Sequence, residues 1–395
     1  MPETLDRPVV SPDAYRAEPV ITLGVEEELQ VVGDDGELVP HDMARGQREY
    51  PDLMGTSSSE VHQCALEIQT PVCMTPDEAV RSLQAMRAVA AHRAQAQGQR
   101  VLSAALHPFS RWADQALNSD AEHFPHYSRL LHEYGDISRS AVSFGMHVHL
   151  APTKPELRMP VMNRLRNVLP DIMALTANAP FFQGRDTGLQ SWRHSLLGRY
   201  PRMGIPDIWA SEGEYWAHVE RLRAAGSMDA GMGLWEDIRI HHKYGTLEVR
   251  IADAVHSLDR VWLVVALLQA EVATLEAELV TGAAPRPIPR PLLEDSKWRA
   301  RRRGVNAEMF DWVSDKPMSF EDRMDRWLRR LAPAAARLGF KDRLNGEMFT
   351  ALHEGAPADQ QREWFRAGGF ANVVDQLVLA TAAPASWRST SNLGA

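Results

Sequence analysis

The sequence has few cysteines, no excess of positive charge and no long apolar run. Cys64 and Cys73 are its only cysteines, too few for a disulfide framework or a cysteine-only metal cage, so we expect a reducing, cytoplasmic location. Acidic residues outnumber basic ones by 52 to 43, which leaves no basic surface for nucleic acid or an anionic membrane. The longest apolar run, Val261–Leu268, is far shorter than the roughly 20 residues that cross a bilayer.

The composition predicts a folded chain with a short leading segment. With 44% apolar and 24% charged side chains among 395 residues, the chain can bury a large core. Residues 1–18 have no basic stretch followed by an apolar one, so we expect a flexible lead and no secretory signal. Residues 19–395 are predicted to form a single domain. A connector at 281–291, with four prolines, precedes a mostly helical C-terminal part that could pack separately.

Turn and capping residues predict individual elements. Ile21–Val32 is typical of a strand, and the turn residues Gly33–Gly36 predict a hairpin. Thr75–Glu78 combines an N-cap, a proline at the first helical position and a capping-box glutamate, which predicts a helix up to Gly98. Helices are also predicted at Pro155–Ala179 with breaks near Pro160 and Pro170, at Ser257–Val280, Ser319–Leu338 and Gln361–Ala380, and strands at Val101–Leu106, Ser140–Leu150 and Gly245–Ala252.

Three of these strands carry polar side chains two residues apart, with apolar neighbours on the opposite face. Since alternate residues of a strand share a face, the members of each pair project together: Glu26 and Glu28, His147 and His149, and Glu248 and Arg250. If the strands join one sheet, these faces line one cavity. Carboxylates select hard cations such as Mg²⁺ or Mn²⁺, and Mg²⁺ commonly bridges carboxylates to substrate phosphates. The pattern therefore favours a metal-bridged nucleotide, although no P-loop or dinucleotide-binding turn is present.

Each pair also has a simpler interpretation. Two glutamates on a strand are often a solvated face, and two histidines can be half-buried imidazoles without a ligand. The pair Glu248 and Arg250 alone would be typical of cross-strand ion pairing. The occurrence of all three pairs in one chain favours a functional site.

Four motifs in this order resemble one known family. They are Thr22-Leu23-Gly24-Val25-Glu26-x-Glu28, Glu60-x-x-Gln63-x-x-x-Glu67-Ile68-x-Thr70-Pro71-Val72-Cys73, Gly145-x-His147-Val148-His149 and Tyr244-Gly245-Thr246-Leu247-Glu248-Val249-Arg250. Together they resemble the type 2 glutamate-cysteine ligases, the bacterial carboxylate-amine ligase family related to glutamine synthetase. The likeness extends from about Ile21 to the C-terminus.

The resemblance implies an α+β catalytic domain in which a curved antiparallel sheet forms a funnel and helices pack on its outer face. It also implies ATP-dependent joining of the γ-carboxyl of glutamate to an amine, with cysteine the first expectation, through an acyl phosphate. The implied partners are small molecules, with a homodimer expected only by analogy. The resemblance assigns two or three Mg²⁺ ions, or Mn²⁺, to Glu26, Glu28, Glu67, His147 and Glu248; catalysis to Arg193, Glu248 and Arg250; and nucleotide binding to Arg250, Trp298 and Arg302.

One segment departs from the family pattern. Around Trp298, the family usually shows Asn-Arg-Trp-Arg-Ala-x-Arg-Tyr-Gly, whereas this chain has Ser296, Lys297 and Arg303 in place of Asn, Arg and Tyr. Lysine cannot form the pair of parallel hydrogen bonds that arginine makes with a carboxylate or phosphate, so we expect substrate contacts in this segment to differ from those of the family. Two alternatives therefore stand beside the first hypothesis: a ligase for a different acid or amine in a specialised pathway, and a nucleotide-binding homologue without catalysis.

Overall fold

The structure is a computed structural model. It describes residues 20–42, 48–50, 55–228, 233–312 and 314–386. The expected flexible lead at residues 1–18 lies outside this described part.

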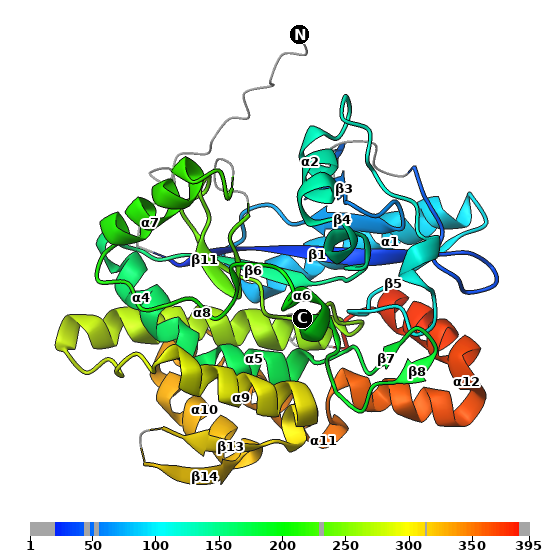
Figure 1. Cartoon of the computed structure of the whole chain (residues 1–395). Helices are drawn as coiled ribbons and strands as arrows, with labels where there is room; N and C mark the ends of the chain where they lie inside the picture. Colours follow the sequence, from blue (N-terminus) through cyan, green and yellow to red (C-terminus); the bar gives the residue numbers. More distant parts are fainter. Residues whose placement is uncertain (1–19, 43–47, 51–54, 229–232, 313, 387–395) are drawn as a thin grey trace.

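One antiparallel sheet dominates the described chain (Figure 1). Its order is β11-β12-β6-β1-β4-β3-β2, and β5 pairs with β1 beside this path. The longest strand, β1, lies at its centre and pairs with both β4 and β6. The strands are β1 (Thr22–Val32), β2 (Arg48–Tyr50), β3 (Gly55–Ser59), β4 (Ala65–Gln69), β5 (Arg100–Leu102), β6 (Met146–Ala151), β11 (Ile238–Ile240) and β12 (Leu247–Val249).

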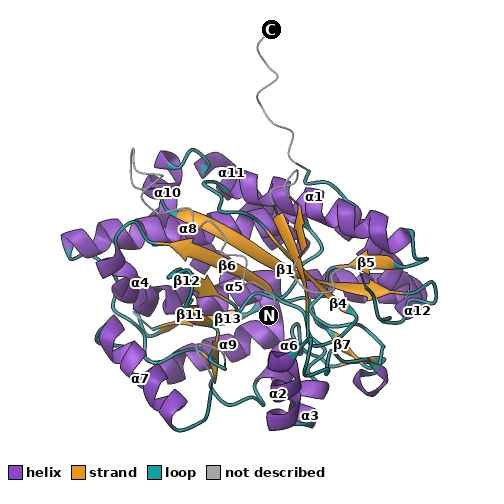
Figure 2. Ribbon diagram, turned by 90° about the horizontal axis from the view of Figure 1, so that it is seen from above, coloured by secondary structure: helices purple, strands orange, loops and turns teal. Residues whose placement is uncertain are grey.

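Two long helices, α1 (Pro76–Gln95) and α8 (Leu258–Thr281), cover one face of this sheet and share its hydrophobic core (Figures 1 and 2). Helix α1 begins as predicted, since the Thr75 hydroxyl accepts a hydrogen bond from the Glu78 backbone amide at 3.2 Å. The Ser257 hydroxyl caps α8 in the same way through the Arg260 amide, at 3.3 Å. These contacts confirm both predicted helices.

The remaining elements surround this core. The other helices are α2 (Pro125–Tyr134), α3 (Asp136–Arg139), α4 (Arg158–Leu165), α5 (Leu169–Thr176), α6 (Arg193–Leu197), α7 (Glu212–Ala224), α9 (Arg290–Arg303), α10 (Phe320–Arg337), α11 (Lys341–Glu354) and α12 (Pro357–Ala382). Short 3₁₀ helices occur at Trp112–Asp114, Pro155–Leu157, Arg166–Val168 and Gly304–Asn306. Small strand pairs are β7 (Phe181–Phe182) with β8 (Arg185–Asp186), β9 (Met203–Gly204) with β10 (Trp235–Glu236), and β13 (Glu308–Asp311) with β14 (Lys316–Ser319).

The predicted α+β class with an antiparallel sheet is confirmed, while several boundaries differ. The strands predicted at Val101–Leu106, Ser140–Leu150 and Gly245–Ala252 shorten to β5, β6 and β12, because ladder pairing ends before the apolar alternation does. The helix predicted at Pro155–Ala179 is interrupted at Arg166–Val168, before Pro170. Pro160 causes no break because it lies in the first turn of α4. Backbone amides in the first turn make no hydrogen bond within the helix, so a proline there removes none.

The C-terminal helices do not pack separately. Helices α10 and α11 pack on α8, and α12 packs on β5. The apolar face of α10, which includes Met324 and Leu331, is buried in the same core as the sheet. Within the described part of the chain, no helix has both the length and the apolar character needed to span a membrane.

A buried ion pair joins the sheet to α1. Glu27 lies between Glu26 and Glu28, so its side chain points to the helical side of the sheet, where it is fully buried. There it pairs with Arg87 of α1, which also donates to the backbone oxygen of Val255 at 2.7 Å. This arrangement leaves the Glu26 and Glu28 face of β1 free for a site.

Candidate active site

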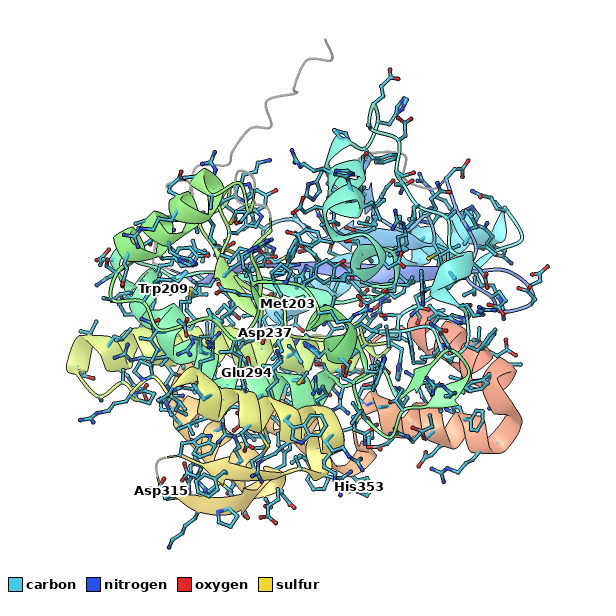
Figure 3. The ribbon with its side chains drawn as sticks, in the orientation of Figure 1. Met203, Trp209, Asp237, Glu294, Asp315 and His353 are labelled. Carbon is cyan, nitrogen blue, oxygen red and sulfur yellow. The ribbon has the colours of Figure 1, made fainter. Side chains whose placement is uncertain are left out.

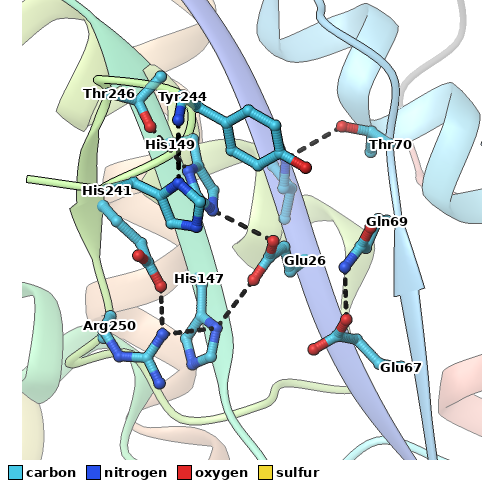
Figure 4. Close-up of polar contacts among 12 residues, drawn as sticks. Glu26, Glu67, Gln69, Thr70, His147, His149, His241, Tyr244, Thr246 and Arg250 are labelled. Atoms are coloured by element: carbon cyan, nitrogen blue, oxygen red, sulfur yellow. Dashed lines mark hydrogen bonds and ion pairs between the residues drawn. The ribbon is translucent and has the colours of Figure 1, made fainter. Parts of the chain in front are cut away.

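Strands β1, β6 and β12 bring Glu26, His147 and Glu248 together, and we call these residues the histidine group. Glu26 and His147 are labelled in Figure 4. Each offers a ligand atom that lies within 4.8 Å of the others. The register explains the convergence, since Glu26 pairs across the ladder with His147, and Glu248 with His149. The prediction that three separate strands share one polar face is therefore met by the geometry.

Two imidazoles hold the Glu26 carboxylate. His147 Nδ1 lies 3.2 Å and His149 Nε2 3.3 Å from its two oxygens, while His149 Nδ1 lies 2.9 Å from the Thr246 hydroxyl. Burial alone would raise the pKa of Glu26, but the hydrogen bonds to both histidines outweigh burial and lower it. Glu26 therefore stays ionised in the folded protein.

Two arginines hold the Glu248 carboxylate on β12. Arg239 of β11 donates from Nε to Glu248 Oε2 at 2.7 Å, and Arg250 forms an ion pair with Oε1. Despite burial, these two cations lower the pKa of Glu248 well below its ordinary value. Arg250 also lies 3.4 Å from His147 Nδ1, so this guanidinium sits inside the histidine group.

Glu28, Glu60 and Glu67 form a second cluster, the acidic group, with ligand oxygens within 4.8 Å of one another. Glu67 accepts hydrogen bonds from the Ser58 hydroxyl at 2.8 Å and the Gln69 amide at 2.5 Å. Burial and then the charge of Glu28 raise the pKa of Glu60 to about 7. Burial followed by the charge of Glu26 raises that of Glu67 as well.

The acidic group suits a divalent cation. In the described part of the chain, no lysine, arginine or histidine forms an ion pair with its three carboxylates. Buried carboxylates repel each other unless a cation or a proton lies between them, and oxygen ligands of this kind match Mg²⁺. The donor atoms present therefore fit the metal that the sequence predicts.

Arg193 reaches the same site from α6. Its side chain is 6% exposed, and its Nη1 lies 3.6 Å from Asp253 Oδ1. The guanidinium lies so close over Gly145 that a Cβ atom there would overlap it, and the same Cβ would come 3.4 Å from His147 Nε2. Glycine at 145 thus gives Arg193 the room to approach His147.

Trp298 and Arg302, predicted to bind the nucleotide, contact neither group in the described structure. Trp298 as a whole is 47% exposed, and the Cζ atom of Arg301 lies over its ring, 4.7 Å from the ring centroid. Arg302 donates to the backbone oxygen of Gly188 at 2.5 Å. Their role in nucleotide binding stays a prediction.

The segment that departs from the family pattern is partly buried. Lys297 of α9 pairs with Asp237 at 2.5 Å (Figure 3, where Asp237 and Glu294 of α9 are labelled). The backbone oxygen of Asp237 in turn accepts the Arg250 amide at 2.8 Å. Lysine at 297 therefore supports Asp237, whose backbone holds Arg250 just after β12, while Arg303 at the end of α9 is exposed.

Sequence reasoning assigned no role to Glu60 and missed Arg239. Glu60 was recognised only as part of a motif, and it follows β3, outside the period-two pattern of the paired strands. The sequence could have indicated Arg239, because Ile238, Arg239 and Ile240 alternate as in a strand. This alternation places the Arg239 side chain on the other face of the strand from the two buried isoleucines.

Comparison with known proteins decides the family. The family model described as glutamate-cysteine ligase family 2 matches residues 22–375. The chain belongs to this family. Among its relatives, "Putative glutamate--cysteine ligase 2-1" of Rubrobacter xylanophilus is 37% identical to this chain over 363 residues, which cover 91% of this chain and 94% of the relative. "Putative glutamate--cysteine ligase 2" of Rhodospirillum rubrum is 34% identical over 384 residues, covering 93% and 97%.

Solved structures confirm the fold of the family member. A bifunctional glutathione synthetase from Pasteurella multocida aligns with a TM-score of 0.69 and 16% identity, over 92% of this chain and 52% of that one. A glutamate-cysteine ligase from Francisella tularensis, solved in complex with AMP, aligns with a TM-score of 0.65 and 13% identity, over 95% and 91%. The resemblance found in the motifs is thereby confirmed.

Proposed function

We propose that this member of the family is an ATP- and Mg²⁺-dependent carboxylate-amine ligase that joins the side-chain carboxyl of glutamate, or of a related acid, to an amine. One observation carries the proposal: the histidine group, the acidic group and three arginines converge on one face of the sheet. Family membership and the fold shared with a glutamate-cysteine ligase support it. Phosphoryl transfer requires this kind of positioning and charge neutralisation.

Two sets of residues would hold the metal ions. Glu26, His147 and Glu248 form one set, and Glu28, Glu60 and Glu67 form the other. When bound, divalent ions would neutralise the phosphate oxygens of ATP and so favour transfer of the terminal phosphoryl group.

The arginines stabilise negative charge at fixed positions. Glu248 and His147 orient Arg250, so its guanidinium is preorganised for the oxygens of the transferring phosphoryl group. Arg239 holds the second oxygen of Glu248 and limits the movement of that carboxylate. Arg193, held by Asp253 near His147, is placed to bind a substrate carboxylate or phosphate oxygen.

The proposed reaction has two steps. A carboxylate oxygen of the acid attacks the terminal phosphorus of ATP, the bond to ADP breaks, and an acyl phosphate forms. The amine nitrogen then attacks the acyl carbon, phosphate leaves with the electron pair of the carbon-oxygen bond, and the nitrogen loses a proton to water. No side-chain nucleophile is needed, which agrees with a site built from carboxylates, imidazoles and guanidinium groups.

The names of the relatives make cysteine the first amine to test. Cytoplasmic location and a homodimer stay predictions. The alternative of a binding protein without catalysis is disfavoured, because the carboxylates, His147 and Arg250 that the chemistry needs are all in place.

The experiment measures ADP formed from ATP, Mg²⁺ and glutamate with a pool of amines, and identifies the product by mass. We expect ADP that depends on both the acid and the amine. Glu26→Ala and Glu248→Ala should abolish it while the circular dichroism spectrum is retained. The matched control is Glu308→Ala, which removes an exposed carboxylate on β13. Full turnover in both site variants would refute the metal assignment.

A further inference from the structure

The ion pair between Lys297 and Asp237 lies outside both the histidine group and the acidic group. Lys297 belongs to α9, and Asp237 directly precedes β11. Both side chains are buried. In the described part of the chain, no other cation forms an ion pair with Asp237. The proposed reaction steps use neither residue, so a buried charge pair beside β11 is left without a role.

Asp237 is connected to the Glu248 carboxylate by two routes. In the first, its backbone oxygen accepts the Arg250 amide, and the Arg250 side chain pairs with one oxygen of Glu248. In the second, Arg239 follows Asp237 by two residues on the same strand, pairs with Glu248 across the ladder, and donates to its other oxygen. The position of Asp237 therefore affects both cations that hold Glu248.

Helix α9 gives Lys297 a fixed support. Leu293 and Ala300 of this helix are buried in the same hydrophobic core as the sheet, so the helix cannot shift without loss of packing. Removal of the lysine charge would leave Asp237 as a buried carboxylate without a counter-charge. Such a group is strongly destabilised and turns toward water or another cation, and its backbone moves with it. The place of the Arg250 amide therefore depends on Lys297.

A small displacement of Arg250 would affect the reaction more than the binding of ATP. A guanidinium that stabilises charge in the transition state acts best when it is fixed in place beforehand, and a misplacement of about 1 Å can slow a reaction roughly 100-fold. Binding of ATP in the ground state would rest mainly on the divalent ions. Displacement of Arg250 should therefore lower kcat and leave the KM of ATP almost unchanged.

We propose that Lys297, acting through Asp237, is a positioning residue for Arg239 and Arg250 and so controls the rate of phosphoryl transfer. This inference rests on the ligase activity proposed above. It extends the catalytic machinery from the sheet to α9, whose lysine touches no substrate.

The test measures ADP formation by Lys297→Met with ATP, Mg²⁺, glutamate and an accepted amine, at a temperature where circular dichroism shows the variant to be folded. Methionine keeps most of the apolar length and removes the charge. We expect kcat to fall at least about tenfold and the KM of ATP to stay within about twofold. Hydrogen exchange at the Arg250 amide should become faster. Lys297→Arg keeps a cation and should restore most of kcat.

A matched control separates positioning from general loss of stability. Arg330 of α10 pairs at 2.7 Å with the buried Glu271 of α8, on the helical side of the sheet. Arg330→Met therefore causes the same kind of damage away from the site. It should lower the melting temperature, as Lys297→Met does, and leave kcat unchanged.

Asp237→Asn serves if Lys297→Met does not fold. Asparagine keeps the shape and can still accept a hydrogen bond from Lys297, so this variant should fold and lower kcat by a smaller factor at unchanged KM of ATP. Wild-type kcat in the folded Lys297 or Asp237 variant, or an equal loss of kcat in Arg330→Met, would overturn the inference and leave the ligase proposal standing. Absence of ADP formation by the wild-type protein with every acid and amine would overturn both.

Discussion

Replacement of Glu60 by glutamine should stabilise the metal-free protein, and the gain should depend on pH. Burial and Glu28 raise the pKa of Glu60 from 4.5 to about 7 in the folded state. The folded protein therefore holds this proton more tightly than the unfolded chain does. As pH rises from 4.5 to 7, the wild-type protein loses stability through Glu60, about 3 kcal/mol in all at 1.36 kcal/mol per pH unit. Glutamine does not titrate, so the unfolding free energy of the Glu60→Gln variant should not fall in this way as pH rises.

The assay is urea unfolding of both proteins in EDTA between pH 4.5 and 8. The unfolding free energies should be similar near pH 4.5, and the variant should exceed wild type by up to about 3 kcal/mol above pH 7. Added Mg²⁺ should cancel most of this difference. A cation at about 100 times its Kd would stabilise wild type by about 2.7 kcal/mol and would bind the variant less well. A difference that is independent of pH, or a variant that gains as much from Mg²⁺ as wild type does, would refute the reasoning.

Three further predictions concern β1 and its neighbours. Glu26→Gln should abolish glutamate-dependent ADP release and change the melting temperature by no more than a few degrees; measurable turnover would contradict the role of Glu26 as a metal ligand. Glu27→Gln should lower the unfolding free energy by about 3–5 kcal/mol in urea, because it leaves Arg87 buried without its partner, and should retain activity per folded molecule. Gly145→Ala should displace Arg193, costing about 1–3 kcal/mol of stability in the same assay and raising the KM of a substrate; unchanged kinetics would show that Arg193 does not bind substrate.

Strand periodicity predicted the part of the site that lies on regular strands. Glu26, His147 and Glu248 point the same way because each alternates with buried apolar residues, and antiparallel pairing places them in register. Capping residues located α1 and α8 because side-chain hydrogen bonds to the first turn are local. Glu67 was assigned only through the resemblance to a family.

Other parts of the site depend on contacts that no local pattern records. Glu60 joins the acidic group from outside the ladder, and Arg193 reaches His147 from α6 only because residue 145 has no side chain. The ion pair between β1 and α1 was also not predicted. Of three consecutive glutamates on a strand, the middle one must lie on the opposite face. Because Glu27 is buried there, it requires a cation, which Arg87 of α1 supplies. Strand lengths were overestimated because hydrophobic alternation continues beyond the last ladder hydrogen bonds.

The most direct test of the account follows the oxygen atom that the acyl phosphate mechanism transfers. Glutamate carrying heavy oxygen in its side-chain carboxyl is incubated with the protein, ATP, Mg²⁺ and an accepted amine, and the released phosphate is analysed by mass spectrometry. We predict one heavy oxygen atom in each phosphate formed together with the amide. Phosphate without heavy oxygen would show that the carboxylate never attacked ATP, and would contradict the proposed ligase mechanism.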